Sequence, residues 1–462
     1  MNENILIVDV LFNTKKGVVN KDVNSGLGTR TLIGKSFRAK ILEKMKRKGV
    51  DMPLIEIAYI SSLLKQHGNN TYYIKIQSEG EFEKLEKEII SQNISTLLFF
   101  PALVAYKDDL LIAKLIKSKF ENIIIGVMGA MATHKPVELI DSKVVDWVIK
   151  GDSENYFLKS DISDINSQSG IVVVDDKVKN LDDLPFPDWA VFGKKLDFSY
   201  KPMLSRTPFL PILGSKGCPM SCKYYCPYPA TQGAKYRRRS VESLISEIKY
   251  LKDKFSVKSI LFRDPYFSLD NRRTIALAKA LIDEDINILW GCETRLDSLS
   301  EENLTLLYKA GLRSINIGLE TNDKFVLESN KRNGVDLTRD EKLIDFSYNL
   351  GIKINAFFII GFNEDTRKTV LNMIQYAKSL NLYAAQFTVN TPLPGTEYYK
   401  DMSSQIIDNN LENFDNNTLV FKHKNLSKED IEQLKEKAFV DYYFRFGFIR
   451  KYIRWTIRDL FF

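Results

Sequence analysis

The feature that most constrains the fold is a twofold series of apolar runs alternating with amphipathic segments. In the first series, short apolar runs such as Ile5–Val10, Thr96–Phe100 and Val144–Lys150 are separated by segments with helical apolar spacing, such as Pro53–His67. This alternation predicts a parallel sheet with helices on both faces, a Rossmann-like arrangement.

A second series begins after Pro208, with strands predicted from Phe209–Leu213 to Ala384–Asn390 and a helix that starts after Ser240. About six strand–helix units of this kind are typical of a complete or partial parallel barrel. Between the two series, Leu181–Asp188 (LDDLPFPD) has the proline content of a stiff connector. We therefore expect an α/β protein with a Rossmann-like domain over 1–155, a connector over 156–205, a barrel over 206–400 and a helical region over 401–462.

Glycine-containing loops follow several strands of the first series. Gly126 and Gly129 lie in GVMGAMATHKP, and Gly151 begins GDSE. Ligands of open parallel sheets bind at the carboxyl ends of strands, and a glycine there lets the backbone approach a bulky ligand. These three glycines are candidate cofactor-binding residues, although such loops also simply turn the chain.

Composition narrows the function classes. The chain has 462 residues and a formal net charge of +7, with both signs interspersed, so no nucleic-acid partner is expected. No run approaches the roughly 20 apolar residues of a membrane span, and the start lacks a basic signal-peptide region. We expect a cytoplasmic protein, where thiols stay reduced and clustered cysteines indicate metal binding or redox chemistry.

Three of the four cysteines, Cys218, Cys222 and Cys226, lie in the loop GCPMSCKYYCPYP after the first barrel strand. Zinc usually takes four ligands, and no second pair or histidine lies nearby in the sequence. A thioredoxin-type site requires CxxC, which is absent. An iron–sulfur cluster remains, and three thiolates on a four-iron cube leave one iron open for chemistry. Cys292, in ILWGC, is interpreted as a buried apolar residue.

Several stretches resemble the cobalamin-binding group of radical S-adenosylmethionine (SAM) enzymes over nearly the whole chain. In the second half these are the cysteine loop and the segments RDPYF, WGCETR, SINIGLET, FFIIGFNE and PLPGT. In the first half they are Pro53–Gly68, Gly129–Pro136, DWVIKGDSE and the connector LPFPDW.

The resemblance implies a [4Fe-4S] cluster on the three cysteines, with SAM on the open iron and cobalamin on the first domain. Reduction of SAM would release a 5′-deoxyadenosyl radical. The resemblance implies a SAM-site set consisting of Asp264, Arg295, Glu320, Thr321, Ile359, Gly361 and Glu364. If the cysteine loop bulges, Tyr225 or Tyr224 takes the aromatic position beside the cluster. No DxHxxG motif is present, and His134 is interpreted as a bystander rather than a cobalt ligand.

The cysteine spacing departs from this group. The usual triplet is CxxxCxxC, whereas this chain has CxxxCxxxC. Either the loop bulges by one residue and still delivers three thiolates, or the third ligand is misplaced; we favour the bulge because the other segments are intact.

The resulting hypothesis is methylation of an unactivated carbon or phosphorus in a small-molecule or lipid-like substrate, with a flavodoxin or ferredoxin as reductant. The alternatives are a cobalamin-assisted cyclisation or rearrangement, and a non-catalytic cobalamin- or cluster-binding sensor. An RNA-modifying methylthiotransferase would need further cysteines in residues 1–200, where there are none.

The chain's last stretch, Asp441–Phe462, is rich in aromatic residues and arginines. Arg450, Arg454 and Arg458 share one helical face, and a neighbouring apolar face is formed by Ile449, Ile453, Ile457 and Leu460. This pattern is compatible with peripheral membrane contact or with packing on the protein's own domain.

Overall fold

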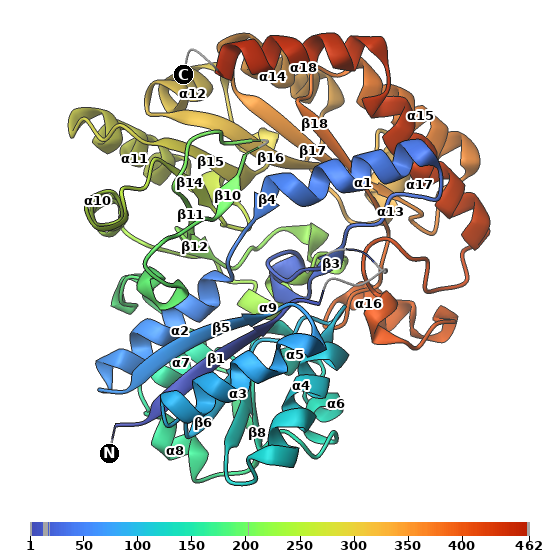
Figure 1. Cartoon of the computed structure of the whole chain (residues 1–462). Helices are drawn as coiled ribbons and strands as arrows, with labels where there is room; N and C mark the ends of the chain where they lie inside the picture. The colour runs from blue at the N-terminus through green and yellow to red at the C-terminus, as the bar shows by residue number, and fades with distance from the viewer. Residues whose placement is uncertain (1, 13–16, 18, 202, 460–462) are drawn as a thin grey trace.

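The computed structural model describes residues 2–12, 17, 19–201 and 203–459. Two six-stranded sheets organise the molecule, one in each half (Figure 1). Every pairing between neighbouring strands of these sheets is parallel. The predicted α/β fold class, with a Rossmann-like first half and a partial barrel in the second, is confirmed.

The N-terminal sheet has the strand order β5-β1-β6-β7-β8-β9. Its strands are β1 (Asn4–Val10), β5 (Asn70–Ile76), β6 (Thr96–Phe99), β7 (Ile124–Val127), β8 (Trp147–Gly151) and β9 (Gly170–Val174). Its helices are α2 (Ile55–Gln66), α3 (Phe82–Ser91), α4 (Tyr106–Lys119), α5 (Ala130–His134), α6 (Pro136–Ile140), α7 (Ser153–Phe157) and α8 (Ile162–Asn166). The central strands are buried on both faces, which is why they are almost wholly apolar.

The barrel sheet has the order β11-β14-β15-β16-β17-β18, so β11 and β18 are its two unjoined edges. Its strands are β11 (Phe209–Ile212), β14 (Ser259–Phe262), β15 (Leu289–Thr294), β16 (Leu312–Glu320), β17 (Lys353–Ile360) and β18 (Ala384–Val389). The helices that accompany it are α9 (Pro227–Gln232), α10 (Val241–Phe255), α11 (Asn271–Asp283), α12 (Glu301–Lys309), α13 (Lys324–Ser329), α14 (Leu337–Leu350), α15 (Arg367–Ser379), α16 (Glu397–Asp401), α17 (Lys428–Tyr443) and α18 (Phe446–Asp459). The predicted helix start at Ser240 is correct, because its hydroxyl caps α10 by accepting from the Ser243 amide at 3.1 Å.

Two of the elements that the sequence did not predict extend or link the halves. One is helix α1 (Phe37–Gly49), which leaves the N-terminal half and lies over the barrel half beside α17 (Figure 1). Its start is held where the Lys35 amide donates to Glu436 at 2.6 Å, and near its other end Lys46 donates to Gln386 on the edge strand β18. The other is β9, which lies in the stretch interpreted as connector and extends the N-terminal sheet.

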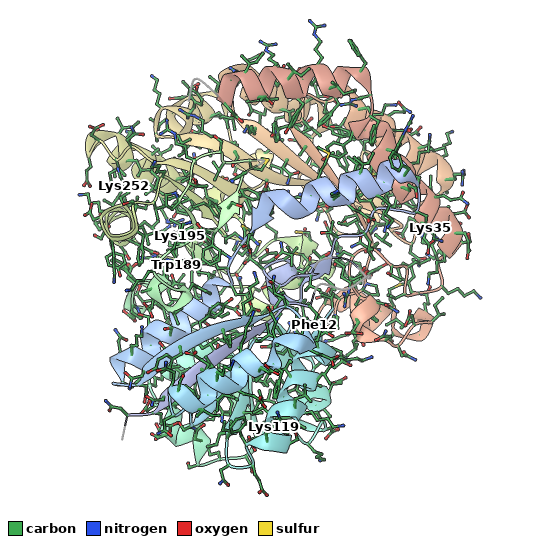
Figure 2. The ribbon with its side chains drawn as sticks, viewed as in Figure 1. Phe12, Lys35, Lys119, Trp189, Lys195 and Lys252 are labelled. Atoms are coloured by element: carbon green, nitrogen blue, oxygen red, sulfur yellow. The ribbon has the colours of Figure 1, made fainter. Side chains whose placement is uncertain are left out.

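The connector is anchored on α2. Its Asp188 accepts hydrogen bonds from Ser61 at 2.7 Å and from Lys65 at 2.6 Å. The next residue, Trp189, is fully buried, whereas the labelled lysines Lys35 and Lys119 lie on the surface (Figure 2). The boundaries given above for the four regions stay predictions.

Three short antiparallel strand pairs accompany the two large sheets in the described residues. The pair β2 (Val19–Asn20) and β3 (Thr29–Arg30) brackets a turn whose Asp22 forms an ion pair with Arg263 of the barrel at 2.9 Å. The adjacent Lys21 instead pairs with Asp9 and Asp109 of the N-terminal half, at 3.2 and 3.1 Å. Successive residues of one turn are therefore tied to opposite halves. Further pairs are β4 (Val50–Asp51) with β10 (Ser199–Tyr200) and β12 (Ser215–Lys216) with β13 (Arg237–Arg238).

Packing of the N-terminal sheet explains two of its glycines. A Cβ atom on Gly126 would lie 2.1 Å from the ring of Trp147, which is fully buried on the neighbouring strand. A Cβ atom on Gly151 would lie 2.0 Å from the carbonyl oxygen of Val174 in β9, and Gly151 also has φ +123°. The protein's own packing therefore requires glycine at both positions.

We predict that Gly126→Ala destabilises the protein by about 1–3 kcal/mol, because the new methyl group overpacks the Trp147 ring. Urea unfolding followed by circular dichroism measures this loss. The matched control is Gly80→Ala, since a Cβ there meets only the Ser78 hydroxyl at 3.7 Å. Equal stability of the two variants would contradict the argument.

Candidate cluster and cofactor site

The cysteine loop lies between β12 and α9, on the chain that follows the first barrel strand. Cys218 is buried, and Cys222 and Cys226 are partly buried. Gly217 before them has φ +82°, and a Cβ there would lie 2.2 Å from the Lys235 carbonyl oxygen. Glycine is therefore required at the entry to this loop.

The four-residue spacing of Cys222 and Cys226 corresponds to one helical turn. The Cys226 amide, which follows a 3-10 turn over Ser221–Tyr224, donates to the Cys222 carbonyl oxygen at 3.0 Å. This hydrogen bond joins residues four apart and brings the two cysteines together at one turn of the chain. The extra residue is absorbed by this turn, which supplies a physical basis for the favoured bulge.

The three thiols form an electrostatic group. Burial raises the pKa of Cys226, and the neighbouring Cys222 and Cys218 raise it further. Burial also raises the pKa of Cys218, while Arg295 and Arg332 act in the opposite direction. All four cysteines are free thiols. Within the described ranges, no group of three or more His, Cys, Asp and Glu side chains is arranged to hold a metal ion.

The donor set nevertheless fits a four-iron cluster. Each thiolate of such a cluster binds a different iron, so the sulfur atoms do not need to converge on one point. Three free thiols, a backbone hydrogen bond that joins two of the cysteines, and two nearby arginines suit an anionic thiolate cluster.

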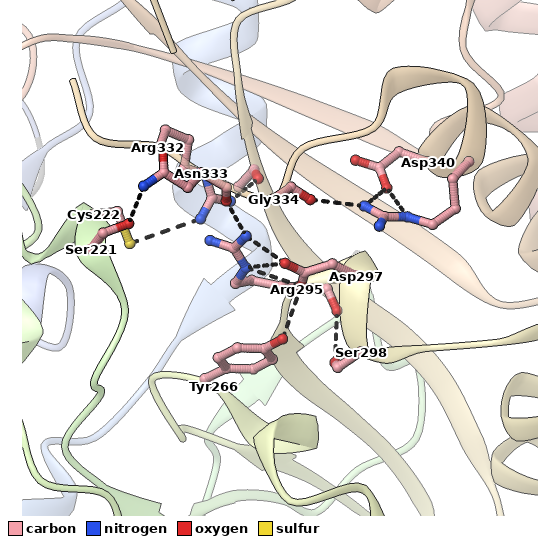
Figure 3. A network of polar contacts seen from close by, with 12 residues as sticks. Ser221, Cys222, Tyr266, Arg295, Asp297, Ser298, Arg332, Asn333, Gly334 and Asp340 are labelled. Atoms are coloured by element: carbon pink, nitrogen blue, oxygen red, sulfur yellow. Dashed lines mark hydrogen bonds and ion pairs between the residues drawn. The ribbon is translucent and has the colours of Figure 1, made fainter. Parts of the chain in front are cut away.

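Arg332 is the centre of the polar network around Cys222 (Figure 3). Its guanidinium donates to the Gly318 carbonyl oxygen at 2.6 Å and to the Cys222 sulfur at 3.8 Å. The Glu320 carboxylate lies 3.7 Å from its Nε atom, and both side chains are buried. Sequence reasoning missed this residue, because KRNG (331–334) has the composition of an ordinary solvated loop.

Glu320 ends β16 in an unusual conformation. Its φ is +63°, and the pairing of β16 with β17 shifts register between Gly318 and Glu320. Left-handed backbone in a non-glycine residue is uncommon and concentrates at functional sites. Burial raises the pKa of Glu320, and Arg332 and Tyr225 oppose the rise. The structure thus brings the predicted residue Glu320 to the cysteine loop, beside Tyr225.

Arg295 lies in the same network (Figure 3). Its Nε atom donates to both carboxylate oxygens of Asp297 at 3.0 Å, and its Nη2 atom donates to the Asn333 carbonyl oxygen at 2.7 Å. Arg295 and Arg332 line a small pocket together with Asp297, Gly318 and Arg339. None of the three cysteines lines this pocket, which adjoins the cysteine loop through Arg332.

The remaining predicted SAM-site residues are held by the protein itself. Both oxygens of the fully buried Asp264 are engaged, accepting from the Gly214 amide at 2.7 Å and the Ser215 hydroxyl at 2.6 Å. Asp264 therefore positions the entry to the cysteine loop in this structure. Thr321 is buried, and its hydroxyl accepts from the Asp323 amide at 3.3 Å.

Strand β17 carries the last part of this set. Ile359 is half-buried, and Gly361 at the strand's end has φ +87°. Glu364 accepts from Asn330 at 3.0 Å, which ties its loop to the segment before Arg332. Phe362 contacts the ring of Tyr225, with centroids 5.5 Å apart, so this loop reaches the cysteine turn. Direct contact of these residues with SAM stays a prediction.

On the N-terminal side, Gly129 is the predicted glycine with the most open surroundings. It has φ +94° and caps α5, and a Cβ there would only touch Glu56 and Phe100 at 3.6 and 3.7 Å. Gly126 and Gly151 are explained by internal packing, so their direct contact with a corrin ring is not needed to account for them. Cobalamin binding by these loops stays a prediction.

His134 makes a contact between the halves. Its Nε2 atom lies 2.9 Å from the Thr231 hydroxyl of α9, and a Cβ on Gly395 would lie 2.3 Å from its ring. Burial lowers its pKa to about 4, and Lys177 and Lys150 lower it further. The interpretation of His134 as a bystander agrees with these protein contacts.

A buried ion pair joins the cysteine loop to the N-terminal half. The Lys216 Nζ atom lies 2.5 Å from the Glu154 Oε1 atom, and both side chains are almost inaccessible to solvent. Lys216 is two residues before Cys218, and Glu154 belongs to the predicted cofactor loop GDSE. The structure therefore places the cysteine loop against the loops at the carboxyl edge of the N-terminal sheet.

This combination defines a class of protein: a partial parallel barrel with a three-cysteine loop after its first strand, faced by a Rossmann-like domain. Residues 212–377 match the family model described as the Radical SAM superfamily. The barrel half of the chain is thus similar to radical SAM proteins.

The comparisons with individual proteins cover more of the chain. It is 25% identical to an uncharacterized methyltransferase of Pyrococcus horikoshii, over 86% of this chain and 89% of that one. It is 24% identical to the anaerobic magnesium-protoporphyrin IX monomethyl ester cyclase of Rubrivivax gelatinosus, over 76% of this chain and 66% of that one. The structure of the cobalamin-dependent S-adenosylmethionine radical enzyme OxsB, with aqua-cobalamin bound, superposes with a TM-score of 0.69. That match has 14% identity and covers 96% of this chain and 67% of the other, so it shows a shared fold.

Replacing Arg332 tests the charge network. We predict that Arg332→Gln destabilises the cofactor-free protein by about 3 kcal/mol, because it leaves the buried Glu320 carboxylate without its nearest cation. Glu320→Gln in the same chain restores part of the loss. Urea unfolding measures both, and Arg339→Gln serves as control because its pair with Asp340 is partly exposed and is worth at most about 1 kcal/mol. Additive losses in the double variant would contradict the coupling.

The pKa of His134 predicts a pH dependence of stability. Because the folded pKa is about 4 and the ordinary value is 6.5, the neutral ring is favoured by folding. The contribution of the neutral His134 ring to the free energy of unfolding is complete above about pH 6.5. It decreases by up to about 3 kcal/mol as the pH falls towards 4. To measure this change, the free energy of unfolding of the cofactor-free protein is compared with that of His134→Gln at about pH 7 and about pH 4.5. A stability difference that is the same at both pH values would contradict it.

Proposed function

We propose that the chain is a cobalamin-dependent radical SAM methyltransferase acting on an unactivated carbon, or phosphorus, of a small-molecule or lipid-like substrate. The observation that carries the proposal is the cysteine loop with its buried arginines, held against the N-terminal loops by the Lys216–Glu154 pair. The similarity to the Pyrococcus methyltransferase over most of both chains supports methyl transfer. A flavodoxin or ferredoxin is the proposed electron donor.

Each group of residues at this site has a separate proposed role. Cys218, Cys222 and Cys226 would hold the cluster. When bound, the cluster, SAM and cobalamin supply radical generation and the methyl group. Arg295 and Arg332 counter the negative charge of the thiolates, and Glu320 is held beside them as a hydrogen-bond acceptor for the amino group of SAM.

The Rossmann-like half is proposed to hold the corrin at the carboxyl edge of its sheet. The loops there are built by Gly129, by Pro101–Tyr106 and by GDSE, which contains Glu154. Lys216 of the barrel half pairs with Glu154 of these loops, so the two proposed cofactor regions adjoin each other.

Cyclisation or rearrangement without methyl transfer is the second candidate. The cyclase of Rubrivivax gelatinosus is the observation in its favour, since it is similar over 76% of this chain. A methyl transfer of this kind yields both S-adenosylhomocysteine and 5′-deoxyadenosine. Cyclisation yields 5′-deoxyadenosine without S-adenosylhomocysteine. A non-catalytic sensor would form neither product.

The deciding experiment is anaerobic reconstitution of the full chain with iron, sulfide and hydroxocobalamin, followed by reductant and SAM. We expect 5′-deoxyadenosine and S-adenosylhomocysteine, measured by mass spectrometry. Formation of 5′-deoxyadenosine alone with the cognate substrate would favour the cyclase. Formation of neither product would overturn the enzymatic proposal.

The extra residue in the cysteine triplet has its own test. We predict that Cys226→Ala loses most of the iron of a reconstituted chain, which holds about four irons in the parent protein, because a cluster ligand is removed. Cys292→Ala is the matched control, since Cys292 is buried in β15 away from the loop, and it should retain its iron. Iron and sulfide analysis with electron paramagnetic resonance measures both, and full cluster content in Cys226→Ala would exclude Cys226 as a ligand.

A further inference from the structure

Helix α18 presents an apolar stripe to solvent. We define the α18 stripe as Phe446, Ile449, Ile453 and Ile457, which are spaced by three or four residues and therefore lie on one helical face. Their side chains are 82%, 47%, 55% and 52% exposed. Isolated exposed apolar residues are ordinary, but four on one face of one helix form a patch that nothing in the described chain covers.

The opposite face of the helix attaches it to the barrel. Trp455 is 3% exposed and packs on the rings of Tyr348 and Tyr383, at centroid distances of 5.6 and 5.7 Å. At the end of α18, Asp459 pairs with Lys353 of β17 at 2.7 Å. The helix is therefore fixed in orientation, and its apolar stripe points away from the protein.

Arginines flank the stripe on one side. Arg450 and Arg454 are exposed and lie one helical position away from the stripe residues Ile449 and Ile453. Arg450 makes no hydrogen bond or ion pair within the described part of the chain, and the Arg454 guanidinium touches the Tyr348 hydroxyl at 3.3 Å. The one acidic residue of α18, Asp459, is already occupied by Lys353. An exposed apolar face bordered by unneutralised arginines complements an anionic lipid surface.

The position of α18 suits such contact. The helix forms the outer rim of the barrel half, on the side away from the N-terminal half (Figure 1). It can lie flat on a surface without obstruction by the N-terminal sheet. Leu460, which continues the stripe in the sequence, lies outside the described residues. No helix in the described ranges is long and apolar enough to cross a bilayer, so contact through α18 would be at the interface.

We propose that α18 binds the protein peripherally to anionic membranes, with the stripe inserted at the level of the headgroups and Arg450 and Arg454 on the lipid phosphates. Such docking would hold the barrel half at the lipid surface, where a lipid-like substrate would be within reach. The proposal concerns binding alone and stands or falls independently of the catalytic function proposed above.

Vesicle sedimentation of the full reconstituted chain tests it. The probes are phosphatidylcholine vesicles and phosphatidylcholine vesicles that also contain phosphatidylglycerol. We expect sedimentation with the anionic vesicles, little with the neutral ones, and weakening as salt increases. The double variant Ile453→Glu, Ile457→Glu should reduce partitioning by about tenfold or more, since it removes apolar area and adds negative charge. Arg450→Ala and Arg454→Ala should each reduce it by about fivefold.

The controls are exposed residues outside α18. Ile90→Glu replaces an isoleucine of α3 that is 70% exposed, and Arg272→Ala removes an exposed arginine of α11. Both should bind as the parent does. Absence of sedimentation with anionic vesicles, or equal loss in the controls, overturns the proposal. Light scattering that shows a dimer in the parent and a monomer in Ile453→Glu, Ile457→Glu also overturns it, because the stripe would then be a subunit interface.

Discussion

The buried ion pair between Lys216 and Glu154 is the contact on which the arrangement of the two halves depends. Lys216 begins the cysteine loop, and Glu154 belongs to a loop at the carboxyl edge of the N-terminal sheet. Asp152 and Glu56 also lie within electrostatic reach of this lysine, and burial together with Glu154 raises the pKa of Glu56 to about 7. Arg237 of the barrel half also pairs with Asp152, at 3.9 Å. Buried charges are costly unless they are paired, so these pairs strongly favour a single relative position of the two loops. The pair thereby joins the proposed cluster site to the proposed corrin site.

A second charge balance operates inside the barrel. Three thiols, Glu320 and Asp297 would place several negative charges in a poorly solvated region, and Arg295 and Arg332 are the cations that face them. Because Arg332 reaches Cys222, Gly318 and Glu320 at once, the cysteine loop and the end of β16 are held in register. The left-handed conformation of Glu320 is maintained by these surroundings, as expected for strain at a functional site.

The sequence predicted every strand of the two six-stranded sheets except β9, because buried parallel strands are continuous apolar runs, which are distinctive. It missed β9, whose alternating half-buried and exposed residues at a sheet edge resemble a loop, and α1, whose mixed basic and apolar sequence becomes a helix by packing on α17. The sequence singled out Gly126, Gly129 and Gly151 as candidate cofactor-binding residues, but internal packing explains two of these glycines. Gly126 is required by Trp147 and Gly151 by the backbone of β9, contacts that no local pattern could reveal.

By itself the sequence determined the kind of chemistry. Three cysteines in one loop, in a chain of alternating strands and helices, limit the site to an iron–sulfur type with an open coordination position, because thiolate number and spacing are local properties. Tertiary structure decided the rest. It turned the anomalous spacing of Cys222 and Cys226 into one hydrogen-bonded helical turn, and it brought Arg332 to the cluster loop across 110 residues. It also faced the stripe of α18 outward, because Trp455 packs on Tyr348 and Tyr383. Long-range packing determines which face of a helix is exposed and which charged side chains pair with each other. No local pattern in a single sequence encodes these contacts.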